Sequence, residues 1–168
     1  VNTSDWSWKT ILPLGHISVY SAFHLSDKIV AIGNTMDKYG LNQNPDFFVV
    51  ENETIKLLAS WGESIGNSVG TDVRFGGGES IVRDGDYIYF STTLDHSSYI
   101  YRIDANGTIE SIIGDEGSVD CFSVHNGKLM FIGLRDQKLQ EVYDENEVCL
   151  TSFNSSVLEG KYVAEPEE

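Results

Sequence analysis

The sequence has few basic residues, with 11 Lys and Arg against 26 Asp and Glu, which gives a formal net charge of −15 at pH 7. A surface this acidic repels nucleic-acid phosphates and anionic lipid head groups, so we expect neither nucleic acid nor a membrane as partner. The sequence also lacks an apolar run near the roughly 20 residues that cross a bilayer. Its first residues, Val1 to Trp8, do not have the pattern of a signal peptide, and a cytoplasmic location is expected.

Cysteine is also scarce, with only Cys121 and Cys149. They are far apart and form no CxxC or Cys/His group, so the sequence predicts neither a zinc site nor a disulfide framework. Both lie in apolar strand-like segments, which favours buried free thiols in a reducing compartment over a disulfide. The acidic residues lack the spacing of a calcium loop, and no metal or cofactor is expected.

Helical periodicity is almost absent, and short β-type runs separated by turn residues take its place. The runs form three groups of four. They are residues 17–25, 28–35, 46–51 and 54–59, then 79–83, 86–93, 98–104 and 108–113, then 118–124, 128–134, 139–143 and 147–150. The dipeptides Asp84-Gly85, Asn106-Gly107 and Asn126-Gly127 separate successive runs, and such pairs favour tight hairpins.

The three groups resemble one another, because Val50, Ile103 and Tyr143 align near the end of each third run. Their spacings are 53 and 40 residues, and repeats of roughly 40 to 50 residues are typical of propeller blades. An insertion at 61–78 explains the larger first spacing. We therefore predict an all-β fold, a partial β-propeller of three four-stranded antiparallel blades. The runs Lys28 to Ile32 and Lys128 to Ile132 are apolar on both faces, which fits blades stacked on one another. The alternative is a β-sandwich of about twelve strands, which the sequential repeats disfavour.

The predicted organisation is blade one at about 9–60, an inter-blade insertion at 61–78, blade two at about 79–114 and blade three at about 115–153. Three blades are fewer than the roughly 4 to 8 of a closed propeller. Two apolar blade faces would then be left uncovered, so we expect self-association, for example a dimer that closes a six-bladed ring.

Two segments carry a family resemblance. The first is Lys38-Tyr-Gly-Leu-Asn-Gln-Asn-Pro-Asp46, which leads into the run Phe47 to Val50. The second is Leu150-Thr-Ser-Phe-Asn154, followed by Leu158 and by Ala164-Glu-Pro-Glu167. With these segments the chain resembles the propeller of the prolyl oligopeptidase family, in particular its acylaminoacyl-peptidase-like branch. The insertion at 66–78 is similar to a pre-blade insertion of that branch.

The resemblance implies that the chain forms the last three blades before an α/β-hydrolase domain, in a propeller of seven or eight blades. Residues 154–168 would be the linker to this missing C-terminal domain. It implies a serine peptidase that cleaves small peptides, with the propeller as the gate for the peptide substrate. The catalytic triad would lie beyond Glu168, so this chain alone would not be an enzyme. A free-standing propeller that binds or scaffolds without catalysis is the alternative, and a periplasmic scaffold is a weaker one.

One motif suggests catalysis in the chain itself. Gly62-Glu63-Ser64-Ile65-Gly66 matches the G-x-S-x-G pattern of hydrolase nucleophiles. That nucleophile sits between a strand and a helix, and the glycine-rich sequence after Gly66 does not predict a helix. We therefore expect Ser64 to be a loop residue. The histidines, His16, His24, His96 and His125, have no carboxylate or nucleophile at an informative spacing, and structural roles are expected for them.

The insertion supplies the candidate substrate contacts. Asp72, Arg74 and Phe75 lie in it, and long loops in compact domains often carry function. In a peptidase of this type, Asp72 or Arg74 would contact the ends of the substrate. The competing interpretation, which the composition favours, is a surface excursion in which Arg74 forms a salt bridge.

Overall fold

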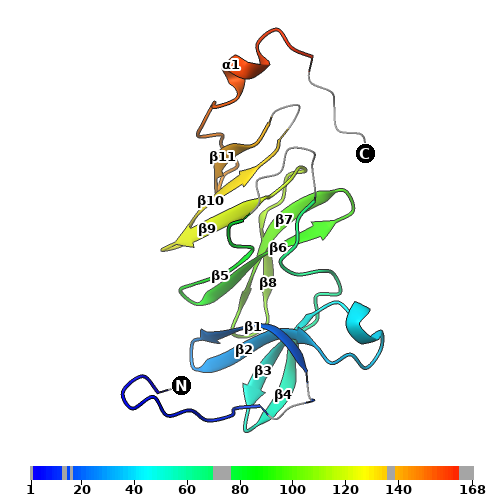
Figure 1. The fold of residues 1–168 in the computed structure, drawn as a ribbon, viewed down its shortest axis with the longest axis vertical. Coiled ribbons are helices and arrows are strands. Elements are labelled where there is room, and N and C mark those ends of the chain that lie inside the picture. The colour runs from blue at the N-terminus through cyan, green and yellow to red at the C-terminus, as the bar shows by residue number, and fades with distance from the viewer. Residues whose placement is uncertain (1, 13–14, 16, 70–76, 136–138, 163–168) are drawn as a thin grey trace. The chain divides into compact units, whose positions relative to one another are not determined.

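The computed structural model describes residues 2–12, 15, 17–69, 77–135 and 139–162. The described chain consists of strands in three antiparallel sheets, with a 3-10 turn and one short helix, α1 (Ser155–Leu158). Each sheet is built from strands that follow one another in the sequence (Figure 1). The predicted all-β fold of sequential antiparallel sheets is therefore confirmed. No helix within the described part of the chain has the length and apolar character that a membrane crossing requires.

The chain divides into two compact units, Val1–Gly62 and Glu63–Glu168. The first unit holds the first sheet. Its strands, in spatial order, are β1 (Ser18–Leu25), β2 (Lys28–Asn34), β3 (Asp46–Glu51) and β4 (Thr54–Ala59). The central strands β2 and β3 are rich in β-branched and aromatic residues that suit a pleated, buried surface. Val30, Ile32 and Phe47 are fully buried, and they form the core of this sheet.

The second unit holds two sheets. The second sheet contains β5 (Ile81–Asp84), β6 (Tyr87–Leu94), β7 (Ser97–Asp104) and β8 (Ile109–Ile113), and the third contains β9 (Cys121–His125), β10 (Lys128–Gly133) and β11 (Glu141–Asp144). One hydrophobic cluster joins them, with Tyr89, Ile100 and Ile113 from the second sheet and Phe122, Leu129, Phe131 and Tyr143 from the third. The two sheets of this unit therefore share a single core.

The first strands of these two sheets, β5 and β9, lie side by side. Just before β5, Glu79 pairs with Phe122 of β9 in an isolated β-bridge, and the Phe122 N–H donates to the Glu79 carbonyl at 3.2 Å. At the next turn, the Asp84 carboxylate accepts the Asn126 N–H at 3.1 Å and the Gly127 N–H at 2.7 Å. Consecutive sheets are therefore fastened to each other along their first strands.

Glu147 also joins the second and third sheets, through a salt bridge on one side and backbone hydrogen bonds on the other. Arg135 lies over the ring of Phe131, with its guanidinium carbon 4.9 Å from the ring centre. Its Nε and Nη2 donate to one oxygen of Glu147 at 3.2 and 3.1 Å. The other Glu147 oxygen accepts the backbone N–H groups of Gly114 and Asp115, both at 3.1 Å, just after β8. Glu147 thus connects the end of the second sheet to the third.

A close backbone approach recurs in the first and third sheets. A Cβ placed on Gly33 would lie 2.2 Å from the Ser18 carbonyl oxygen, and one placed on Gly133 would lie 2.0 Å from the Ser118 carbonyl oxygen. Both glycines stand near the end of the second strand of their sheet. Ser18 is the first residue of β1, and Ser118 lies just before β9. A side chain at either glycine would push the two strands apart. The two sheets thus repeat the same structural detail.

One of the hairpin turns has the predicted type I′ conformation, and another has a different type. Asn126 and Gly127 both have positive φ, +52° and +75°, as a type I′ turn requires. The β5–β6 turn differs from the prediction, because Asp84 pairs with Tyr87 and the loop residues are Gly85 and Asp86. Only the first of these has positive φ, +56°, which is typical of a type II′ turn.

The third sheet differs from the predicted four-stranded blade, because the fourth run, residues 147–150, is not a strand. The Leu150 N–H still donates to the Val142 carbonyl at 2.7 Å. The Val142 N–H, however, donates to the Thr151 hydroxyl at 3.0 Å instead of to a backbone carbonyl. A side chain thus ends the ladder, and only an isolated bridge between Tyr143 and Cys149 remains.

The two faces of the third sheet differ in burial. In β10, Leu129 and Phe131 are 1% exposed, whereas Met130 between them is 53% exposed. Leu129 and Phe131 pack in the core shared with the second sheet. The run Lys128 to Ile132 is therefore apolar on both faces but fully buried on only one.

Candidate functional site

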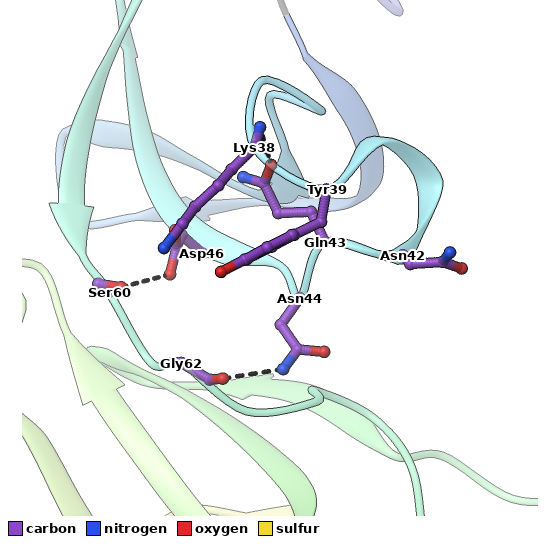
Figure 2. Close-up of a pocket in the computed structure, with 8 residues that line it drawn as sticks. All are labelled: Lys38, Tyr39, Asn42, Gln43, Asn44, Asp46, Ser60 and Gly62. Carbon is purple, nitrogen blue, oxygen red and sulfur yellow. Dashed lines mark hydrogen bonds between the residues drawn. The ribbon is translucent and has the colours of Figure 1, made fainter.

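A polar groove lies in the first unit (Figure 2). Its volume is about 790 Å³. One wall is the connection between β2 and β3, which includes the 3-10 turn η1 (Gly40–Asn42), and the other is the segment that follows β4. The lining residues are Lys38, Tyr39, Asn42, Gln43, Asn44 and Asp46 on one side and Ser60 and Gly62 on the other.

Hydrogen bonds hold the two walls together. The Ser60 hydroxyl donates to Asp46 Oδ1 at 2.8 Å, and the Trp61 N–H donates to the same oxygen at 3.1 Å. The Asn44 side-chain amide donates to the Gly62 carbonyl at 2.8 Å. The groove is therefore formed before any ligand enters it.

Gln43 fixes the loop that carries the first wall. Its side-chain oxygen accepts the Lys38 N–H at 3.1 Å, and its backbone carbonyl accepts the Asn34 side-chain amide at 2.9 Å. Asn34 is the last residue of β2 and is 1% exposed. A buried side chain at the end of a strand thus anchors an exposed loop.

Lys38 and Tyr39 extend across the groove together. The Lys38 ammonium nitrogen lies 4.8 Å from the centre of the Tyr39 ring, a cation–π contact. Figure 2 shows both side chains directed toward Asp46, whereas Asn42 points away. The described lining contains one carboxylate and no histidine or cysteine. Nor does the described chain hold a group of three or more metal-ligating side chains. The polar side chains and the ammonium of the lining suit the groove to a polar ligand.

A second polar cluster surrounds Glu141, the first residue of β11, which is 5% exposed. Its carboxylate accepts hydrogen bonds from the Thr151 hydroxyl, the Phe153 N–H at 3.1 Å, and the Asn154 N–H at 2.9 Å. The Asn154 side-chain amide donates to the same carboxylate at 3.1 Å and to the Gln140 carbonyl at 2.8 Å. We call this cluster the Glu141 clasp.

The clasp changes the acidity of Glu141. Burial by itself raises the pKa of this carboxyl, but the hydrogen bonds donated by Thr151, Asn154 and Phe153 outweigh burial, and the pKa lies below its ordinary value. The carboxylate is therefore charged at neutral pH and holds the Leu150 to Asn154 segment against β11. The Thr and Asn of that segment, noted for a family resemblance, are the residues that bind it.

The predicted substrate contacts, Asp72, Arg74 and Phe75, lie outside the described residues. Ser64 lies in an irregular segment, with neither the preceding strand nor the following helix of a nucleophile elbow. Its carbonyl accepts the Thr92 hydroxyl at 2.7 Å, which holds the segment along β6. The prediction that Ser64 is a loop residue is confirmed.

Each of the three histidines that the structure describes lies in a separate local setting. His24 lies in β1, and His125 ends β9 beside Asn126, whose amide nitrogen is 3.1 Å from His125 Nε2. His96 Nε2 is 3.9 Å from the Glu116 carboxylate on the surface. His16 lies outside the described residues.

Both described cysteines are free, as predicted, but the predicted burial is wrong. Cys149 is exposed because the run that contains it is not a full strand, and its thiol donates to the Thr151 carbonyl at 3.1 Å. Cys121 is half-buried. Burial, together with the neighbouring Asp120 carboxylate, raises the pKa of the Cys121 thiol, which makes it a poor nucleophile.

The groove and the clasp were not predicted as sites. Their segments stand out in the sequence only through the family resemblance, and Gln43 and Glu141 have no local signature. A carboxylate that pairs with residues about ten positions further on leaves no periodic pattern. No protein-family model and no curated protein sequence matches the chain.

Proposed function

We propose that the chain is a non-catalytic segment of a β-propeller, three blades that control peptide access to the α/β-hydrolase domain of a serine peptidase. The packing of the second unit is the observation that supports it best. There, consecutive meander sheets share one core and are fastened along their first strands, β5 and β9. This is the relation between neighbouring blades, whose first strands line the propeller axis.

The repeated details of the sheets support the same proposal. The glycine–serine approach occurs at equivalent places in the first and third sheets, although 100 positions separate Gly33 from Gly133. Equivalent packing at equivalent positions is expected of structural repeats. The sandwich alternative does not require it.

The groove lies at one end of the first sheet. In a four-stranded meander, the connections after the second and fourth strands lie at the same end of the sheet. The β2–β3 connection and the segment after β4 form the groove. If the hydrolase domain covers this end of the blade, the groove faces the peptide substrate.

The peptidase assignment is tested on the full gene product with a fluorophosphonate, which labels activated serines. We expect labelling of one serine outside this chain and hydrolysis of short peptides, both unchanged by Ser64→Ala. Labelling that disappears with Ser64→Ala would place catalysis in this chain and would contradict the proposal.

The alternative function is a binding module with no catalytic domain, which the preformed groove favours. It predicts that the full gene product is not labelled by the fluorophosphonate while still binding a ligand in the groove. We also propose that the isolated chain self-associates, since Met130 lies exposed on an uncovered sheet face. Sedimentation velocity at micromolar concentration tests this, and a strictly monomeric profile would contradict it.

A further inference from the structure

The Lys38 ammonium is available to an anion. It rests on the Tyr39 ring, and the structure records no ion pair between Lys38 and Asp46, the carboxylate of the lining. Asp46 Oδ1 already accepts hydrogen bonds from the Ser60 hydroxyl and the Trp61 N–H. These donors compensate part of the Asp46 charge, so a second anion beside Lys38 meets less repulsion.

One lining residue of the groove is a largely exposed aromatic side chain. Tyr39 is 62% exposed and lies on the loop that forms the first wall. Its ring beside the Lys38 ammonium suits a ligand that carries both an anionic and an apolar group. An inorganic anion would leave the ring in water, whereas a side chain of a peptide would cover it.

The backbone of the same loop is strained. Met36 has φ +58°, a conformation that costs a residue with a side chain about 1 kcal/mol or more. Its own side chain is not buried, so packing does not compensate for this cost. The Gly40 N–H donates to the Met36 carbonyl at 3.2 Å and closes the turn that presents Lys38 and Tyr39. Strain of this kind is found where a loop is held ready for a ligand.

We propose that the groove binds the C-terminal carboxylate of a short peptide through Lys38; the choice of a peptide rests on the proposed function. The ammonium pairs with the carboxylate. An apolar side chain of the peptide covers the Tyr39 ring. A groove of about 790 Å³ suits a few residues of peptide.

The test is a titration of the full gene product, treated with a fluorophosphonate so that no peptide is hydrolysed. The ligands are acetyl-Ala-Leu-Phe with a free C-terminal carboxylate and the same peptide as a C-terminal amide. We expect the free acid to bind about five- to tenfold more tightly, as for a charge-assisted contact at a partly exposed site. Lys38→Met keeps the apolar stem on Tyr39 and removes the charge, so it should abolish the difference.

Lys128→Met is the matched control, because Lys128 is an exposed first residue of a strand outside the groove; it should leave the difference unchanged. Equal binding of acid and amide, or a difference that survives Lys38→Met, overturns the inference. So does the absence of binding of both peptides at millimolar concentration.

Failure of this inference is distinguishable from failure of the proposed function. A gene product that the fluorophosphonate labels, but whose preference for the free acid does not depend on Lys38, is a peptidase that recognises its substrate elsewhere. A product that is not labelled, but prefers the free acid through Lys38, has the peptide site without the peptidase.

Discussion

Glu147 in the third sheet occupies the turn position that Gly107 occupies in the second. Both residues have positive φ, +60° and +87°. Each donates its N–H to the carbonyl of an aspartate three residues earlier, Asp104 at 3.1 Å and Asp144 at 3.0 Å. A glutamate at such a position is strained where glycine is not. The strain is compensated by the contacts of the Glu147 carboxylate with Arg135 and with the backbone after β8.

Replacing Glu147 by glycine should therefore destabilise the protein even though it relieves the backbone. Arg135 would lose its partner while its side chain is only 9% exposed. The lost ion pair outweighs the relief of about 1 kcal/mol, and we expect a net loss of about 2 kcal/mol in the free energy of unfolding. Urea denaturation measures it. Glu145→Gly, an exposed residue of the same turn, is the control, and a Glu147→Gly protein as stable as the wild type would contradict this account.

The Glu141 clasp should make stability depend on pH. The pKa of Glu141 is lowered in the folded protein, so its contribution is complete above the ordinary value of 4.5 and is lost as the pH falls through that value toward the lower folded pKa. Glu141→Gln should lower the free energy of unfolding by about 1 to 2 kcal/mol at pH 7. It should also make that free energy depend less on pH below pH 4.5. Urea unfolding between pH 7 and pH 3 measures both effects. Glu145→Gln should keep the wild-type profile, and a Glu141→Gln protein that also keeps it would show that the clasp does not contribute.

The close approach at Gly133 predicts a large cost for a single methyl group. In Gly133→Ala the new Cβ would lie 2.0 Å from the Ser118 carbonyl oxygen, so β10 must move away from the backbone at Ser118. We expect a loss of about 3 kcal/mol, at the upper end of overpacking effects. Gly114→Ala is the control, because a Cβ there meets only the Ser111 hydroxyl at 3.4 Å. Thermal unfolding compares the two variants, and equal melting temperatures would refute the packing argument.

The two cysteines should react at different rates. Cys149 is exposed, whereas Cys121 is half-buried and has a raised thiol pKa. Brief treatment of the native protein with iodoacetamide at pH 7.5 should modify Cys149 first, as read by peptide mass mapping. In Cys149→Ser the reaction should slow markedly, and both thiols should react alike after denaturation in urea. Faster modification of Cys121 in the native protein would contradict the burial described for it.

The sequence predicts the strands well because their determinants are local. The predicted runs 46–51 and 54–59 coincide with β3 and β4, since short apolar runs and the two-residue turn between them define both. The missing fourth strand of the third sheet depends on a Thr151 hydroxyl that replaces a backbone acceptor. The residues of the run 147–150 contain no signal that the Thr151 hydroxyl will take this hydrogen bond.

The candidate site is less predictable, because it depends on contacts between residues that are distant in the sequence. Asn34 anchors the groove loop through Gln43, and Glu141 binds Asn154, in each case between residues that only the folded chain brings together. The sequence pointed to the right segments, but it could not pair their side chains. The exposure of a side chain also depends on which elements pack against its strand. The sequence pattern therefore suggests that Met130 is a core residue, whereas in the structure it is exposed.

The shared core of the second unit has a consequence for synthesis on the ribosome. Ile100 and Ile113 of the second sheet pack in one cluster with Phe131 and Tyr143 of the third. The emerging second sheet therefore has no complete core of its own. At the usual rate of translation its apolar face stays open for on the order of a few seconds, until Tyr143 has left the exit tunnel. During that interval the nascent chain is at its most prone to aggregate, and it would depend most on chaperones.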